Sequence, residues 1–220
     1  MTEVNLNDKA YKYLRELIVS NQLLPGSAIV EKDICSLLNI SRTPVREAFR
    51  RLEAEGVLIR NQRQKKGTFV RDVTYADILE ISEIRKLFEL YALPPCVNNI
   101  SDADIGFLET KFNSLREDSS KETFFDADRE LHRIIMSYCL NSRMLGFLNN
   151  INAQLERLRR ISGGTPNRLP ASKKEHQDIL EAIKARDIVS ASRSLDFHLE
   201  NVKTSILTSY QQIRTDVNIY

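Results

Sequence analysis

The chain has 220 residues, of which 28% are charged and 42% hydrophobic. This balance is typical of a globular protein with one large domain or two small ones. No apolar run approaches the ~18 residues that a membrane-spanning helix needs, and residues 1–7 lack the features of a signal peptide. The three cysteines are far apart in the sequence, which argues against a disulfide framework and for a reducing compartment. We therefore expect a cytoplasmic protein that does not bind the membrane.

The net charge of +2 conceals a basic segment in the first third of the chain. Between Arg42 and Arg71 there are nine basic and three acidic side chains. Such a local excess suits a polyanionic partner. The same charges could also belong to an ordinary solvated surface.

Apolar periodicity predicts three helices in the N-terminal part, over about residues 7–19, 31–38 and 42–55. Asn7 is a suitable N-cap for the first, Ser41 or Thr43 for the third, and Gly56 is placed to end the third. Two short β-type segments follow at residues 57–60 and 68–70. Three helices followed by a hairpin predict a winged helix-turn-helix domain over residues 1–72.

The remainder of the chain predicts only helices, which indicates an all-α bundle over residues 73–220 and a mainly α protein. The expected spans are 75–92, 102–117, 121–139, 143–161, 172–185 and 188–210. Pro94 and Pro95 should end or kink the first of these helices, because proline lacks the N–H that an interior helical position donates.

The third N-terminal helix has two different faces. Its apolar residues recur at helical spacing and should pack on the preceding helices: Val45, Ala48, Phe49 and Leu52. Arg42, Arg46 and Arg50 recur every four residues on another face, where they could enter a DNA major groove. Residues 63–67 (RQKKG) would form a basic wing loop. An amphipathic helix with solvated arginines is the alternative.

These segments resemble the signature of GntR-type bacterial regulators. The resemblance covers residues 30–48 (VEKDICSLLNISRTPVREA), 52–58 (LEAEGVL) and 67–70 (GTFV). It implies a DNA-binding domain in which Lys32, Arg42, Thr43 and Arg46 occupy DNA-contacting positions. Gly67 matches the glycine of the wing, where the backbone can approach the duplex closely.

The only three histidines, His132, His176 and His198, each lie on the apolar stripe of a different predicted helix. Asp128 precedes His132 by one helical turn. Inward-facing ionisable groups are costly to bury unless they are paired or bind a metal. Three imidazoles and one carboxylate suit Zn, Ni, Mn or Fe, whereas a hydrogen-bonded network in the core is the alternative.

A second resemblance covers this part of the chain. Residues 128–132 (DRELH), 175–183 (EHQDILEAI) and 195–199 (LDFHL) are similar to the FCD effector domain of FadR-type GntR regulators, in the VanR-like branch with six helices. It implies that Asp128, His132, His176 and His198 hold a divalent metal at the floor of a ligand pocket. Residues 84–89 (IRKLFE) match the first FCD helix, which makes Arg85 a candidate to bind an effector carboxylate. An ordinary surface arginine is the alternative.

Together the resemblances imply a ligand-responsive bacterial transcription regulator, a repressor that binds an inverted-repeat operator in double-stranded DNA as a homodimer. A small carboxylate metabolite would be its effector, and the protein would associate with the nucleoid when bound to DNA. No catalytic residue is expected. The alternatives are a metal-dependent enzyme acting on a small carboxylate with an appended DNA-binding domain, and a purely architectural DNA-binding protein.

Overall fold

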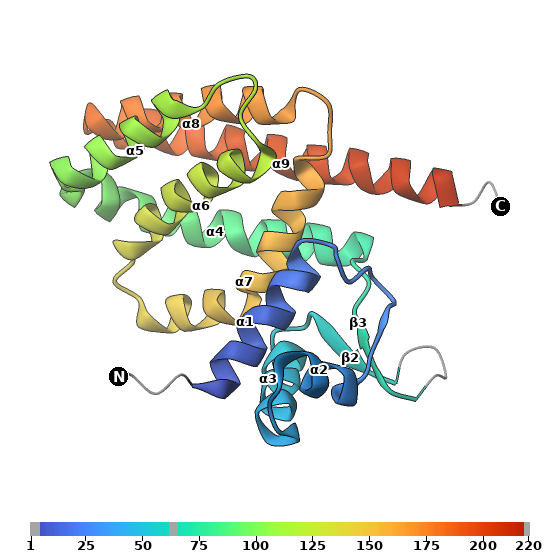
Figure 1. Cartoon of the computed structure of the whole chain (residues 1–220). Coiled ribbons are helices and arrows are strands. Elements are labelled where there is room, and N and C mark those ends of the chain that lie inside the picture. The colour runs from blue at the N-terminus through green and yellow to red at the C-terminus, as the bar shows by residue number, and fades with distance from the viewer. Residues whose placement is uncertain (1–4, 62–65, 218–220) are drawn as a thin grey trace. The chain divides into compact units, whose positions relative to one another are not determined.

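The structure is a computed structural model that describes residues 5–61 and 66–217, with side chains to residue 212 (Figure 1). Its elements in chain order are α1 (Leu6–Val19), β1 (Ala28–Ile29), α2 (Glu31–Leu38), α3 (Arg42–Ala54), β2 (Leu58–Arg60), β3 (Thr68–Val70), α4 (Tyr75–Asn99), α5 (Asp102–Ser114), α6 (Lys121–Ser137), α7 (Ser142–Ser162), α8 (Arg168–Lys184) and α9 (Ile188–Val217). They form two compact units. The first contains the chain up to residue 74 and residues 148–157 of α7, and the second contains residues 75–147 and the chain from 158 onward.

The first unit is a winged helix-turn-helix, so the expected fold of this part is confirmed. Its sheet has the order β1-β3-β2 and both pairings are antiparallel, with Ile29 opposite Thr68 and Ile59 opposite Phe69. The strand β1 was not expected, because two residues are too few to show an alternating pattern. The expected domain boundary after residue 72 remains a prediction.

A buried polar contact fixes α3 against α1 in this unit. Glu55, which ends α3, is 5% exposed and accepts hydrogen bonds from the hydroxyl of Tyr11 at 2.8 and 3.0 Å. The guanidinium of Arg51 lies 3.5 Å from the centre of the Tyr11 ring. Gly56 follows with φ of +68°, a left-handed conformation that favours glycine and ends the helix as expected.

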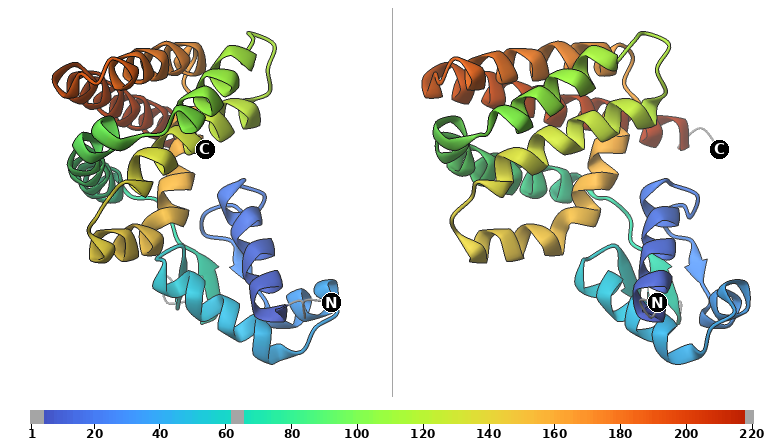
Figure 2. Two further views of the ribbon diagram at one scale, coloured as in Figure 1. Left: turned by 90° about the vertical axis from the view of Figure 1, so that its left-hand side faces the viewer. Right: turned by 60° about the vertical axis from the view of Figure 1, so that its left-hand side comes forward.

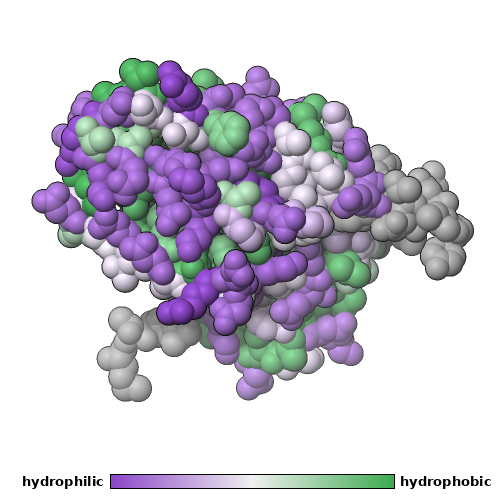
Figure 3. Space-filling model, turned by 90° about the horizontal axis from the view of Figure 1, so that it is seen from above, coloured by the Kyte–Doolittle hydropathy of each residue, from purple (hydrophilic) through white to green (hydrophobic). Residues whose placement is uncertain are grey.

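The second unit is an all-α bundle, which also agrees with the expected fold class. The helix α9 packs along both α4 and α8, and α6 packs against α4 (Figures 1 and 2). The core of the bundle is apolar, with Leu93, Leu108, Leu131, Ile134, Ile179 and Leu195 among its fully buried members. Hydrophilic side chains cover most of the face visible in Figure 3. None of the helices described here has the length and apolar character to cross a membrane.

Pro94 and Pro95 were expected to end or kink the first helix of the bundle; they do not end it, because α4 continues to Asn99. Each proline removes one helical N–H, which deprives the carbonyls of Leu90 and Tyr91 of their donors. Tyr91 is exposed, so water can replace a donor on that side. The packing of Ala92, Leu93, Cys96 and Val97, all fully buried, outweighs the local preference of the two prolines.

Other helix boundaries differ from expectation by a few residues. Asn5, and not Asn7, caps α1, and its side chain accepts a hydrogen bond from the backbone N–H of Asn7 at 3.0 Å. The helix α8 begins at Arg168, so Pro170 lies inside its first turn. Proline is tolerated there because the N–H groups of the first turn have no helical acceptor.

Candidate metal centre and nucleic-acid interface

The winged helix presents basic side chains on α2 and α3. Arg42, Thr43 and Arg46 are exposed on α3, and Lys32 is exposed on α2. The apolar residues of α3 are buried, so the helix has the two faces that the sequence predicts. Arg46 Nε donates to Glu31 Oε2 at 2.9 Å, and the two side chains are 52% and 32% exposed. This contact orients Arg46 while leaving it accessible to a partner.

The wing is described only in part. Gly67 is exposed and has a φ of +133°, a conformation that disfavours any side chain. Its backbone carbonyl accepts from the N–H of Asn61 at 2.9 Å, which closes the base of the loop. Lys66 is exposed. Arg63, Gln64 and Lys65, which we expected in the basic wing loop, lie outside the described residues.

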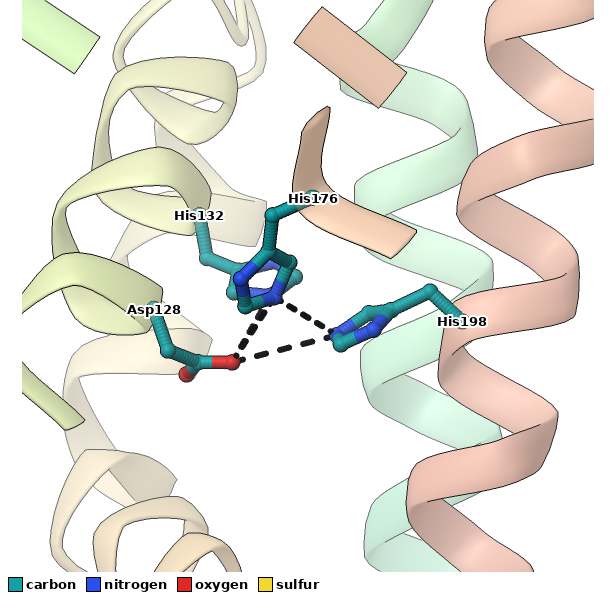
Figure 4. A group of neighbouring side chains, drawn as sticks. All are labelled: Asp128, His132, His176 and His198. Atoms are coloured by element: carbon teal, nitrogen blue, oxygen red, sulfur yellow. Dashed lines mark hydrogen bonds and ion pairs between the residues drawn. The ribbon is translucent and has the colours of Figure 1, made fainter. Parts of the chain in front are cut away.

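The structure brings Asp128, His132, His176 and His198 together in the second unit (Figure 4). Asp128 and His132 come from α6, His176 from α8 and His198 from α9. All four are buried, and one ligand atom from each lies within 4.8 Å of the others. Asp128 Oδ1 is 3.1 Å from His176 Nε2, and that nitrogen is 3.2 Å from His198 Nε2. The Nε2 atoms of His132 and His198 lie 3.5 and 3.8 Å from the same oxygen.

These distances fit a metal ion. Ligand bonds of about 2.0–2.1 Å in a tetrahedral site place the ligand atoms roughly 3.4 Å apart. The four separations given above, from 3.1 to 3.8 Å, bracket that value, and all the ligand atoms lie within 4.8 Å of one another. His132 Nε2 is buried and has no hydrogen-bond partner among the described residues. A buried nitrogen without a partner is costly in a core network, and a metal ion would supply the missing contact.

The electrostatics of the cluster also suit a cation. Burial raises the pKa of the Asp128 carboxyl, but the charges of Arg159 and His132 outweigh this effect and hold it well below its ordinary value. Burial lowers the pKa of His176. Burial and the neighbouring His176 together lower the pKa of His198 to about 3. Asp128 thus stays an ionised carboxylate, and burial favours the neutral imidazoles of His176 and His198, the protonation states in which these groups bind metals.

A cavity of about 20 Å³ adjoins the cluster. This volume is enough for about one water molecule. Four of the residues that line it are basic, namely Arg85, Arg159, Arg168 and Lys173, and they lie beside Asp128 and His176. The cavity could therefore accept an anion, but a metabolite would have to widen it.

Arg85 lies inside the bundle, so the alternative of an ordinary surface arginine is wrong. It is 6% exposed, and its Nε donates to Glu89 Oε1 at 2.7 Å. Its Nη2 is buried without a hydrogen-bond partner among the described residues. Arg85 thus has one donor committed within the protein and another available at the cavity.

Several polar residues of the site were not expected from the sequence: Glu89, Arg159, Arg168, Lys173 and Glu175. Glu89 follows Arg85 by one helical turn on the buried stripe of α4. This spacing of opposite charges could have predicted an ion pair from the sequence. Arg159 lies in a run of arginines on α7 that reads as an exposed surface. The pairing of Arg159 with Asp128 of α6 is visible only in the tertiary structure.

Comparison with known proteins agrees with this organisation. The family model described as "Bacterial regulatory proteins, gntR family" matches residues 6–70, and the FCD domain model matches residues 80–201. The HTH-type transcriptional repressor RspR of Escherichia coli K12 is 27% identical over 215 residues, which cover 96% of this chain and 91% of that protein.

Solved structures share the fold. E. coli McbR/YncC superposes with a TM-score of 0.77 at 23% identity and covers 96% of this chain and all of the other. The Zn²⁺-bound FCD domain of TM0439 gives a TM-score of 0.52 at 22% identity, over 61% of this chain and 94% of that domain. An FCD domain can therefore bind a metal. The chain belongs to the GntR family of bacterial transcriptional regulators and carries an FCD domain behind its winged helix-turn-helix.

Proposed function

We propose that this regulator is a ligand-responsive repressor whose FCD domain holds a divalent transition metal and senses a small carboxylate. One observation carries the proposal. A buried cluster of one carboxylate and three imidazoles, at ligand spacing, occurs in the same chain as a winged helix with an exposed basic face. The repressor RspR, similar along nearly its whole length, supports the direction of regulation.

The DNA-binding part of the proposal rests on α3. Arg42 and Arg46 would contact base edges in the major groove, where arginine recognises guanine through two hydrogen bonds. Thr43 and Lys32 would bind phosphates, and Gly67 would let the wing backbone approach the duplex. A homodimer would place two such helices on the half-sites of an inverted repeat.

In the FCD domain, Asp128, His132, His176 and His198 would hold the metal, which could be Zn, Ni, Mn or Fe. When bound, the metal would offer a Lewis-acid position to a carboxylate oxygen. Arg85 would bind the carboxylate through its free Nη2, in a charge-assisted hydrogen bond. Because the cavity is about 20 Å³, admission of a metabolite requires the walls to move.

That movement is the proposed source of regulation. A ligand changes an equilibrium only to the extent that it binds one state better than another. An effector that binds the widened cavity would favour the conformation in which the cavity is wide. The coupling free energy between effector binding and operator binding would then set the change in operator affinity.

The test begins with selection of bound fragments from a genomic DNA library at physiological salt, since affinity depends strongly on salt. Enrichment of one inverted repeat is expected. Small carboxylates are then added to the complex with that operator, with and without a chelator. A carboxylate that shifts operator affinity only in the metal-loaded protein supports the proposal. If no sequence is enriched, the proposal of specific operator binding is refuted. Turnover of the carboxylate would instead favour the metal-dependent enzyme.

A further inference from the structure

Two buried carboxylates outside the ligand set reach the histidines from behind. Glu89 of α4 lies against His132, with 2.5 Å between Glu89 Oε2 and His132 Nδ1. Glu175 of α8 lies against His198, with 2.7 Å between Glu175 Oε2 and His198 Nδ1. The two carboxylate side chains are 5% and 9% exposed. Both contacts use the ring nitrogen that points away from Asp128.

These contacts determine which nitrogen of each ring carries the proton. An ionised carboxylate can only accept hydrogen bonds, so the Nδ1 atoms of His132 and His198 donate to Glu89 and Glu175. Arg168 Nη2 also lies near His198 Nδ1, but at the longer distance of 3.4 Å, and it donates to Glu175 at 2.7 Å. In a neutral imidazole the other nitrogen then has its lone pair free. That nitrogen is Nε2, which in both residues faces Asp128 Oδ1. The lone pairs are thereby directed to the one point where a metal ion would lie.

An arginine holds each of these carboxylates in place. Arg85 Nε donates to Glu89 Oε1 at 2.7 Å. Arg168 binds Glu175 through both terminal nitrogens, at 2.9 and 2.7 Å. Each carboxylate thus pairs with an arginine on one side and accepts from the Nδ1 of a histidine on the other.

The third histidine lacks this support. No carboxylate outside the ligand set bonds to His176 among the described residues, and its Nε2 has the hydroxyl of Ser172 at 3.4 Å. His132 and His198 thus resemble each other and differ from His176. The repeated Arg–Glu–His arrangement on two separate pairs of helices argues against a chance contact.

We propose that Glu89 and Glu175 are positioning residues that fix the tautomer and orientation of His132 and His198 for metal binding. The inference rests on the metal site of the proposed function. In metal sites generally, removal of such an outer partner weakens metal affinity about 10–100-fold. We expect the loss of Glu89 or Glu175 to weaken metal affinity by a similar factor in this protein.

The first experiment needs neither a variant nor a metal. Long-range ¹⁵N–¹H correlation spectra of the metal-free wild-type protein report which nitrogen of each histidine is protonated. The Nδ1–H form is expected for His132 and His198. Protonation of either residue on Nε2 would overturn the proposal for that residue, whether or not the protein later binds a metal.

The second experiment measures Zn²⁺ affinity by competition with a chelator in the full-length Glu89→Gln and Glu175→Gln variants. Each is expected to bind Zn²⁺ about 10–100-fold more weakly than wild type, with an altered absorption spectrum when Co²⁺ replaces Zn²⁺. Glu55→Gln is the matched control, since Glu55 is equally buried and bonded to an arginine but touches no histidine. Its Zn²⁺ affinity should equal that of wild type.

The outcomes separate this inference from the proposed function. Variants that fold without metal and bind Zn²⁺ within twofold of wild type would overturn the positioning role. If wild type itself binds no metal, the metal site of the proposed function fails, and the histidine tautomers decide the inference. If a variant fails to fold, the wild-type tautomers still decide it.

Discussion

Asp128 divides its carboxylate between two partners: Oδ2 accepts a hydrogen bond from Arg159 Nε, and Oδ1 lies 3.1 Å from His176 Nε2. The arginine of α7 therefore balances the charge of Asp128 from one side while the other oxygen faces the histidines. Both side chains are about nine-tenths buried. Asp128 is at once a candidate ligand and half of a buried ion pair, so its substitution should affect stability with and without metal.

We predict that Asp128→Asn lowers the free energy of unfolding of the metal-free protein by about 3–5 kcal/mol, because Arg159 loses its buried counter-charge. Metal affinity should also fall by more than the 10–100-fold expected for an outer partner. Denaturant unfolding with a chelator measures the first effect, and Zn²⁺ competition the second. Asp126→Asn is the control, since the ion pairs of Asp126 among the described residues are partly exposed and worth about 0–1 kcal/mol. Equal stability of the two variants would contradict the prediction.

His176→Ala should lower metal content and thermal stability together. His176 is 2% exposed and lies between Asp128 and His198, so its loss removes one ligand and leaves a cavity. Metal binding is measured separately, as the rise in melting temperature when Zn²⁺ is added. The size of this rise depends on the ratio of the free Zn²⁺ concentration to the dissociation constant. This rise should shrink in the variant. An unchanged metal stoichiometry would remove His176 from the ligand set.

Local sequence patterns are enough to predict that the side chains of the four cluster residues face the core of the bundle. Asp128 and His132 are one helical turn apart, and His176 and His198 each share a stripe with aliphatic residues. The stripes face the core, and a bundle core is small enough to bring them together. The same patterns cannot reveal Glu89 behind His132, because the two are 43 residues apart and meet only when α4 packs on α6.

Local sequence patterns are less reliable for predicting where helices and strands begin and end. A proline pair is a strong local signal, but the buried residues on both sides of Pro94 and Pro95 keep α4 continuous. The strand β1 depends on pairing with β3 and has no local signal of its own. Both cases depend on tertiary contacts, which periodicity and propensity do not contain.

Arg85→Gln should reduce metal affinity as well as the response to an effector. The substitution removes the guanidinium that fixes Glu89, and Glu89 in turn holds His132. We expect Zn²⁺ binding to weaken about 10-fold in the absence of any carboxylate. Arg133→Gln is the control, because Arg133 is exposed on α6 and, within the part of the chain that the structure describes, forms an ion pair with Glu130 alone. A variant that loses the effector response and keeps its Zn²⁺ affinity would restrict Arg85 to anion binding.

The three cysteines should differ sharply in reactivity. Burial and the charge of Asp104 raise the pKa of Cys96 to about 12. Because the thiolate is the reactive form, at pH 8 only about one Cys96 in 10,000 is ionised. Cys139 is also buried, whereas Cys35 on α2 is half-buried. Iodoacetamide at pH 8 should modify Cys35 first in the native protein and all three thiols in denaturant, as mass spectrometry of the peptides would show. Native alkylation of Cys96 as fast as Cys35 would contradict the structure.

Arg46→Ala should abolish specific operator binding and leave metal content intact. Arg46 is exposed on α3, and Glu31 holds its guanidinium in a defined direction. A base contact by arginine is worth about 1–3 kcal/mol of discrimination, and a dimer would lose one such contact in each half-site. Binding isotherms on the enriched operator and on an unrelated duplex, at one salt concentration, measure the loss of specificity.

Arg193→Ala controls for the removal of one positive charge, since Arg193 is exposed on α9 in the other unit. Its operator affinity should match wild type, and both variants should bind one equivalent of Zn²⁺ per chain. Undiminished operator affinity in Arg46→Ala would overturn the assignment of α3 as the recognition helix. Equal losses on the operator and the unrelated duplex would instead make Arg46 a phosphate contact, because phosphate contacts carry no sequence information.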